Sequence, residues 1–207
     1  MKSVPAMIIA LLALIGCREP RVSEVLKDLS GSRYLRVAAA KDYSIEIRLM
    51  PRRMSVVALA GLEPGRIVTP ELLDSLDRNA GLALGVQFYM RISPNDSTLP
   101  SHENDLIYGS KNGFDSYQAA LLAYQDGLAR QIWAEASGKK YALSTGRMVN
   151  NYGLGRGREF VLVFPEGVLG GEGAEHDLTI VLDDLVPGLG RSRLTWNLNK
   201  SEYENSI

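Results

Sequence analysis

The feature that most constrains this 207-residue chain is a strict alternation of side chains at residues 82–92. Every second position is apolar: Leu82, Leu84, Val86, Phe88, Met90 and Ile92. Successive side chains of a β-strand point to opposite faces of the sheet, so this spacing places all of them on one face. The pattern predicts a strand with one face packed on a core and a more polar face turned outward.

Other short segments carry strand signals of the same kind or are continuously apolar. The further predicted strands are residues 43–49, 54–60, 131–136, 140–144, 160–164, 178–182 and 193–198. The sequence at residues 137–140, Ser-Gly-Lys-Lys, is typical of a hairpin turn. Many short strands separated by Gly and Pro turns favour a mainly β fold, an antiparallel β-sandwich (Ig-like or barrel-like) with one or two short helices. An α+β arrangement is the alternative.

Two helices are expected between the strands. Thr69 suits an N-cap and Pro70 suits the first helical position, ahead of an apolar stripe that includes Leu73. The second helix is expected at residues 115–126, with Gly127 ending it.

The first seventeen residues have the composition of a sorting signal. Lys2 precedes an apolar run at residues 4–16, which is shorter than the roughly 20 residues that span a bilayer as a helix. The sequence Leu14-Ile15-Gly16-Cys17 resembles the lipobox of bacterial lipoproteins, in which a cysteine follows branched apolar and small residues. Cys17 is the only cysteine of the chain and stands where the lipobox requires one.

The resemblance implies cleavage before Cys17, a diacylglycerol on the Cys17 sulfur and a palmitate-type acyl chain on its amine. Two or more acyl chains anchor a protein stably to a membrane. By the sorting rule of Gram-negative lipoproteins, Arg18 at the next position implies the outer membrane rather than retention at the inner membrane.

The lipobox also sets the expected organisation of the chain. We expect a cleaved signal peptide at 1–16, a lipid anchor and tether at 17–33, a single β-rich domain at 34–199 and a polar tail at 200–207. Within the tether, apolar side chains from Val22 to Leu29 have helical spacing, so a short helix either rests on the domain or acts as a spacer.

Composition excludes some functional classes. The balance of 23 Lys and Arg against 24 Asp and Glu argues against electrostatic capture of nucleic acid. A single Cys excludes a disulfide framework and a Cys-ligated zinc site. No cofactor and no metal site is predicted.

The long segment 93–113 is the best candidate contact surface, because long segments without regular structure are usually functional or disordered. Its candidate ligand-binding residues are His102, Glu103, Asp105 and Tyr108. Solvated loop side chains are the simpler interpretation of the two histidines, His102 and His176. The spacing of acidic residues in this segment does not match an EF-hand.

Two other features admit a functional interpretation beside a structural one. The Gly-rich segment with Arg156 and Arg158 precedes a strand rather than a helix, which favours a hairpin connection over a phosphate loop. Trp133 and Trp196 fall in predicted strands, where packing in the core or on the sheet face is favoured over sugar stacking.

These observations predict a non-enzymatic, membrane-anchored envelope lipoprotein. Its partners would be the membrane, through lipidated Cys17, and an unidentified envelope protein that contacts the β-rich domain during interaction or assembly. The first alternative is a glycan- or peptide-binding module that uses residues 93–113. The second is a metal-assisted hydrolase, which requires His102 and His176 to converge.

Overall fold

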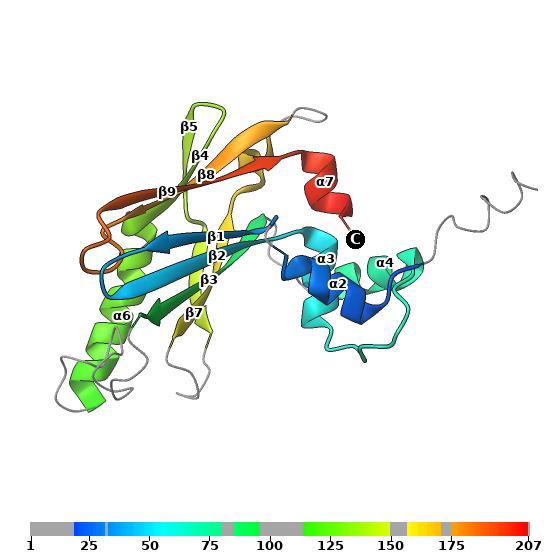
Figure 1. Ribbon diagram of the computed structural model, residues 1–207, viewed down its shortest axis with the longest axis horizontal. Helices are drawn as coiled ribbons and strands as arrows, with labels where there is room; N and C mark the ends of the chain where they lie inside the picture. Colours follow the sequence, from blue (N-terminus) through cyan, green and yellow to red (C-terminus); the bar gives the residue numbers. More distant parts are fainter. Residues whose placement is uncertain are drawn as a thin grey trace, which may run out of the picture.

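The computed structural model describes residues 19–31, 33–79, 85–95, 114–149, 157–170 and 175–206. Two antiparallel sheets form the body of the molecule (Figure 1). The five-stranded sheet has the order β1 (Leu35–Ala39), β2 (Tyr43–Met50), β3 (Val86–Pro94), β7 (Arg158–Phe164) and β6 (Thr145–Val149). The four-stranded sheet has the order β5 (Lys139–Ala142), β4 (Ile132–Ala136), β8 (His176–Asp183) and β9 (Arg191–Leu198). The fold is therefore mainly β and antiparallel, as the sequence predicted.

The alternation that led to this prediction lies in β3, at the centre of the five-stranded sheet. Val86, Phe88, Met90 and Ile92 are all buried. The Phe88 ring meets the Trp196 ring of β9 edge-on, with centroids 5.1 Å apart, so side chains of the two sheets pack against each other there. Positions 82–84 of the predicted strand lie outside the described residues.

The described residues contain five α-helices, whereas the sequence predicted one or two in the β-rich domain and a short one in the tether. They are α2 (Val22–Leu29), α3 (Arg52–Leu59), α4 (Pro70–Asn79), α6 (Phe114–Gln131) and α7 (Lys200–Asn205), with a 3₁₀ turn η1 (Glu166–Leu169). Helices α2, α3 and α4 gather beside one end of the sheets, at the right of Figure 1, and are called the helical lobe below.

The strand predicted at residues 54–60 is wrong, because this segment is helix α3. Pro51 precedes the helix, and the Ser55 hydroxyl donates a hydrogen bond to the Pro51 carbonyl at 2.9 Å, four residues back. Met54 and Val57 are buried one helical turn apart, a spacing that a helix supports and a strand does not.

The polar tail predicted at residues 200–207 is also corrected, because residues 200–205 form α7. Tyr203 is buried, its hydroxyl donates to the Gly85 carbonyl at 3.3 Å, and it accepts from the Gln87 amide at 3.1 Å. Burial raises the pKa of Tyr203 to about 12. One aromatic anchor thus holds an otherwise polar helix on the body.

The helix predicted at residues 115–126 continues through Gly127 to the end of α6. Leu128 is fully buried, and the Tyr124 ring lies 5.8 Å from the Phe160 ring of β7, so packing outweighs the cost of a helical glycine. The predicted hairpin between β4 and β5 is confirmed. Its turn residues Ser137 and Gly138 have φ values of 50° and 73°, the left-handed pair that such a tight turn requires.

Candidate functional site

The N-terminal segment is bound to the helical lobe by three backbone hydrogen bonds. The Val68 amide donates to the Pro20 carbonyl at 2.9 Å, and the amides of Val22 and Ser23 donate to the carbonyls of Arg66 and Pro64 at 2.9 and 3.0 Å. Arg21 also forms an isolated antiparallel bridge with Ile67. Residues 19–23 and 63–68 therefore form one surface, which we call the N-terminal platform.

Helix α2 continues directly from this platform into the core. Val22, Val25 and Leu29 are buried and belong to the main hydrophobic cluster. Of the two alternatives left by the sequence, a helix resting on the domain or a spacer, the structure has the first. Within the described residues, the chain is bound to the lobe from Pro20 onward, three positions after Cys17 in the sequence. Cys17 itself lies outside the described residues.

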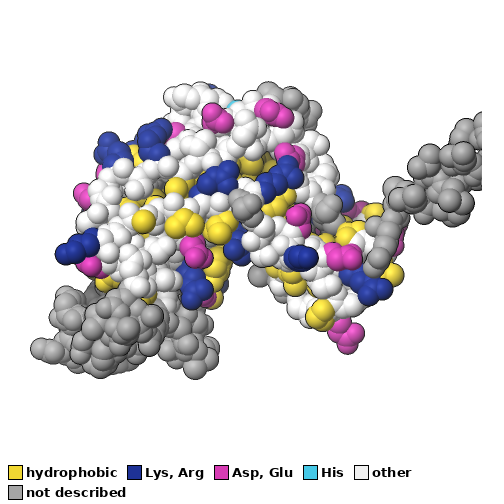
Figure 2. All heavy atoms as spheres, viewed as in Figure 1, with side chains coloured by type: hydrophobic (Ala, Val, Ile, Leu, Met, Phe, Trp, Pro, Cys, Tyr) yellow, Lys and Arg dark blue, Asp and Glu magenta, His cyan; other side chains and the backbone are white. Residues whose placement is uncertain are grey.

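The platform carries mixed charges around one exposed apolar side chain. Ile67 is 52 % exposed. Arg21 lies opposite Ile67 in the bridge, Arg66 precedes Ile67 in the sequence, and both arginines are exposed, as are Glu19 and Glu63 on the same segments. Figure 2 shows hydrophobic side chains interspersed with both kinds of charge over the lobe at the right of the view. This composition suits neither a strongly anionic nor a strongly cationic partner.

A pocket of about 370 Å³ lies where the edge strands β1 and β9 meet α7. Its floor is apolar, with buried Tyr34, Leu49, Trp196 and Tyr203. The Trp196 indole donates to the Tyr34 carbonyl at 2.9 Å, which joins the two sheets beneath the pocket.

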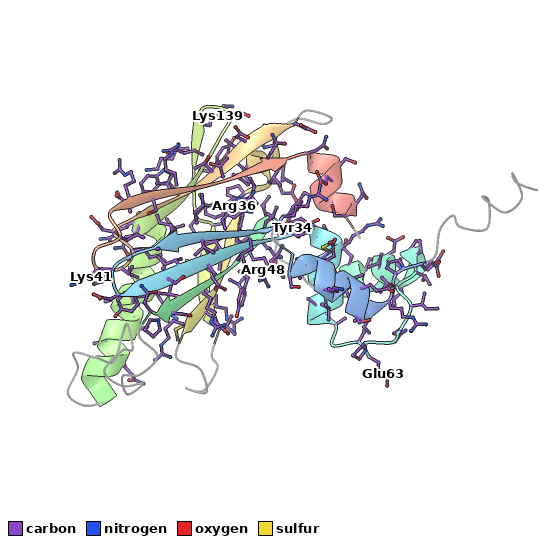
Figure 3. All side chains as sticks on the ribbon, viewed as in Figure 1. Tyr34, Arg36, Lys41, Arg48, Glu63 and Lys139 are labelled. Carbon is purple, nitrogen blue, oxygen red and sulfur yellow. The ribbon has the colours of Figure 1, made fainter. Side chains whose placement is uncertain are left out.

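Two arginines form the rim of this pocket. Arg36, labelled with Tyr34 in Figure 3, donates to the carbonyls of Thr195, Arg33 and Leu35 at 2.8, 3.1 and 2.9 Å. The Arg36 guanidinium also lies 5.5 Å from the centre of the Trp196 ring. Arg33 pairs with Glu202 of α7. A ligand here would meet mainly the guanidinium edge, because Trp196 is 1 % exposed and lies under Arg36.

The outer face of the four-stranded sheet is ionic. Trp133 is covered by Lys140, whose ammonium lies 3.8 Å from the ring centre, and its indole donates to Glu135 at 3.0 Å. Arg193 forms an ion pair with Glu135, and this hydrogen bond, together with that from Trp133, holds the pKa of Glu135 below its usual range. The Trp133 ring is therefore covered by cations, and its surroundings do not resemble an open sugar-stacking face.

Most of the site residues predicted from the sequence lie outside the described residues. These are Cys17, His102, Glu103, Asp105, Tyr108 and Arg156. The convergence of His102 with His176 therefore stays a prediction. The His176 ring nitrogen lies 2.8 Å from the Val168 carbonyl, an interaction that positions η1 against β8. Among the described residues, no group of three or more His, Cys, Asp or Glu could hold a metal ion.

The remaining sequence candidates have structural surroundings. Arg158 begins strand β7 opposite Ile92. Gly157 precedes it at a close approach, since a Cβ there would lie 2.8 Å from the Ser93 hydroxyl oxygen and 2.9 Å from the Ile92 carbonyl. Trp196 is 1 % exposed, so its ring is not available to stack on a sugar. Sequence reasoning missed the pocket, because Tyr34 and Trp196 are brought together only where the two sheets pack against each other.

None of the helices in the described part of the chain is long and apolar enough to cross a membrane.

Comparisons with known proteins add little. No family model matches the chain, and no curated protein matches it. A DUF4426 family protein from Pseudomonas aeruginosa PAO1 matches 81 % of this chain and 95 % of its own at 12 % identity, with a TM-score of 0.33. A protein of unknown function from Burkholderia pseudomallei K96243 matches 86 % of this chain and 83 % of its own at 8 % identity, with a TM-score of 0.35. At these TM-scores neither likeness carries an argument.

Proposed function

We propose that the chain is a non-enzymatic envelope lipoprotein whose lipid on Cys17 holds the β-rich domain close to a membrane. The domain would contact an envelope protein there, in interaction or assembly. The observation that carries the proposal is that a described contact with the lobe, the Pro20–Val68 hydrogen bond, lies only three positions after Cys17 in the sequence. Cleavage before Cys17 would leave every described element intact, as the lipobox-like sequence requires.

The decisive experiment is metabolic labelling with radioactive palmitate in a bacterial host. The natural chain is expected to incorporate label and to fractionate with membranes. Cys17→Ser removes the acceptor sulfur and should abolish both. The matched control is Ser23→Ala on the platform, which leaves the lipobox unchanged and should be labelled normally. Equal labelling of the natural chain and Cys17→Ser, or of neither, would contradict the proposal.

The proposed outer-membrane location has its own test, which uses the residue after the acylated cysteine. Arg18→Asp should move the protein from the outer to the inner membrane fraction of a Gram-negative host while palmitate labelling continues. Arg18→Lys serves as the control and should stay in the outer membrane. If Arg18→Asp also stayed there, residue 18 would not determine the location.

A second candidate function is binding of a short peptide, and the pocket beside β1 and β9 favours it. The cavity above the buried floor could take an apolar side chain of the peptide, and the guanidinium of Arg36 could face a terminal carboxylate. Trp196 lies in the pocket wall and provides an intrinsic fluorescence signal. In a Trp133→Phe background, titration with peptides that end in a free carboxylate should change this emission, and the same peptides with an amidated end should not. Unchanged emission with both sets would remove this candidate.

A further inference from the structure

We propose that the N-terminal platform, residues 19–23 and 63–68, lies against the phospholipid headgroups of the membrane that holds the acyl chains. The inference rests on the proposed function, since it requires a lipid on Cys17. It adds a specific membrane-facing surface and a defined orientation of the domain. The lobe would face the membrane, and the β4–β5 hairpin would point away from it.

The first argument is the short reach of the tether. Cys17 and Pro20 are three positions apart, with two residues between them, and an extended chain spans at most about 3.6 Å per residue, so this first part of the tether reaches about 11 Å. The headgroup layer on each side of a bilayer is about 5–8 Å thick. Because the acyl chains must enter the hydrocarbon, the Pro20 carbonyl cannot lie far above the headgroups. The Pro20–Val68 hydrogen bond holds the rest of the platform at the same level.

The second argument is the chemistry of the platform surface. Ile67 is half exposed at a place where three backbone hydrogen bonds fix the chain, so the exposure is a property of the folded lobe. Arg21 and Arg66 can donate to lipid phosphates, and Glu19 and Glu63 can accept from lipid amines. Balanced charge around an apolar side chain matches a zwitterionic headgroup layer better than a strongly anionic surface.

The third argument is the separation of the β4–β5 hairpin from the platform. Glu63 and Lys139, both exposed and both labelled in Figure 3, are well separated in the view, with Lys139 at the top of the body and Glu63 at the lower right. Lys139 belongs to the β4–β5 hairpin, where the surface is rich in Lys and Arg from β5 and β9. Orientation by the short tether should therefore place these two residues at very different heights above the bilayer.

Cysteine labelling tests this orientation directly. In the acylated protein the Cys17 sulfur is a thioether, so an introduced cysteine is the only free thiol of the chain. Glu63→Cys and Lys139→Cys, each carrying a bimane probe, are reconstituted in phosphatidylethanolamine and phosphatidylcholine vesicles with a nitroxide on the headgroup. We expect quenching at position 63 at least about twofold stronger than at position 139, given a tether reach of about 11 Å.

A spacer variant tests the role of tether length. About twenty Gly and Ser residues inserted between Arg18 and Glu19 add a flexible span of roughly 25 Å and should reduce quenching at position 63 to the level at position 139. Equal quenching at the two positions in the natural-length chain would overturn the inference. Quenching at position 63 that survives the spacer would overturn the role given to the tether.

Failure of the anchor itself is recognisable in the same preparation. If the parent chain without an introduced cysteine reacts with maleimide, Cys17 carries a bare thiol and the proposed function falls. If the parent chain is unreactive and bound to vesicles while position 63 is unquenched, the anchor stands and only the headgroup contact falls.

Discussion

The helical lobe and the outer face of the four-stranded sheet differ in how far they expose a large apolar side chain to water. On the lobe, backbone hydrogen bonds fix the N-terminal segment while Ile67 stays half exposed between balanced charges. On the sheet, Trp133 is 8 % exposed because Lys140 lies over its ring and Glu135 accepts a hydrogen bond from its indole N–H. The sheet covers its large apolar side chain, and the lobe does not.

The contrast indicates which surface is adapted to water and which is available to a partner. Long cationic side chains shield aromatic surface while their charged ends stay hydrated. The outer sheet face therefore needs no partner to shield its aromatic ring from water. Ile67 is exposed near the point where the lipid would attach, and its burial against a neighbouring surface would be favourable.

The largest effect is expected where the two sheets join. Trp196→Ala removes the ring that packs on Phe88 and the hydrogen bond to the Tyr34 carbonyl, and should lower the free energy of unfolding by about 3–5 kcal/mol. Urea denaturation followed by circular dichroism measures the loss. Trp133→Ala should lower the free energy of unfolding clearly less, because its ring lies on the outer face under Lys140 and not between the two sheets. Equal losses would mean that the outer face is part of the core.

The next effect tests whether the lobe and the sheets unfold together. Leu29→Ala removes a buried side chain of α2 and should cost about 2–4 kcal/mol of global stability. Lys27→Ala, on the exposed side of the same helix, should stay within about 0.5 kcal/mol of the natural chain. A loss confined to the helical signal, with the sheets unchanged, would show that α2 is a separate tether after all.

The fold class could be predicted from the sequence because the central strands are patterned by burial. In β3 every buried position is apolar, so period two is visible in the residues themselves. Strand β6 was missed because it exposes alternate residues and includes Gly146, where a Cβ would lie 2.8 Å from the Leu143 side chain. Helix α3 was predicted as a strand because a short apolar run has no period of its own.

The candidate surfaces could not be predicted, because each is formed by contacts between segments that are far apart in the sequence. The platform joins residues 19–23 to residues 63–68, and no local pattern marks either segment as exposed. The pocket requires Tyr34 and Trp196, which are 162 positions apart. The lipobox could be recognised because its residues are contiguous. Local chemistry is thus visible in a sequence, whereas a surface assembled from distant segments requires the fold.

A smaller effect concerns the helix that follows the platform. The Thr69 hydroxyl accepts from the Leu72 amide at 3.2 Å and caps α4, as the sequence predicted. Thr69→Ala leaves that amide without its cap and should cost about 1 kcal/mol, while Thr69→Ser keeps the hydroxyl and should cost little. Thermal unfolding of the three proteins gives the comparison. If both variants were equally destabilised, the methyl group rather than the cap would be responsible.

The smallest expected effect is a dependence of stability on pH, which arises from two carboxyl groups on the outer sheet face. The hydrogen bond from Arg193 is the main cause that lowers the pKa of Glu135, and the one from Arg191 lowers that of Asp183. A carboxyl group whose pKa is lower in the folded state stabilises the fold above its unfolded pKa, and this contribution is lost as the pH falls through its folded pKa. Solvent screening keeps both contributions small, because these side chains are partly exposed.

Glu135→Gln should therefore weaken the acid sensitivity of the natural chain without abolishing it. The measurement is the urea midpoint at neutral pH and at about pH 3, below the usual pKa of both carboxyl groups. The difference between the two midpoints should shrink in Glu135→Gln and shrink similarly in Arg193→Gln, since either change removes the same ion pair. High salt should reduce the difference in the natural chain as well. An unchanged acid response in both variants would place the acid sensitivity elsewhere, and the ion pairs over Trp133 would then shield the ring without contributing charge stabilisation.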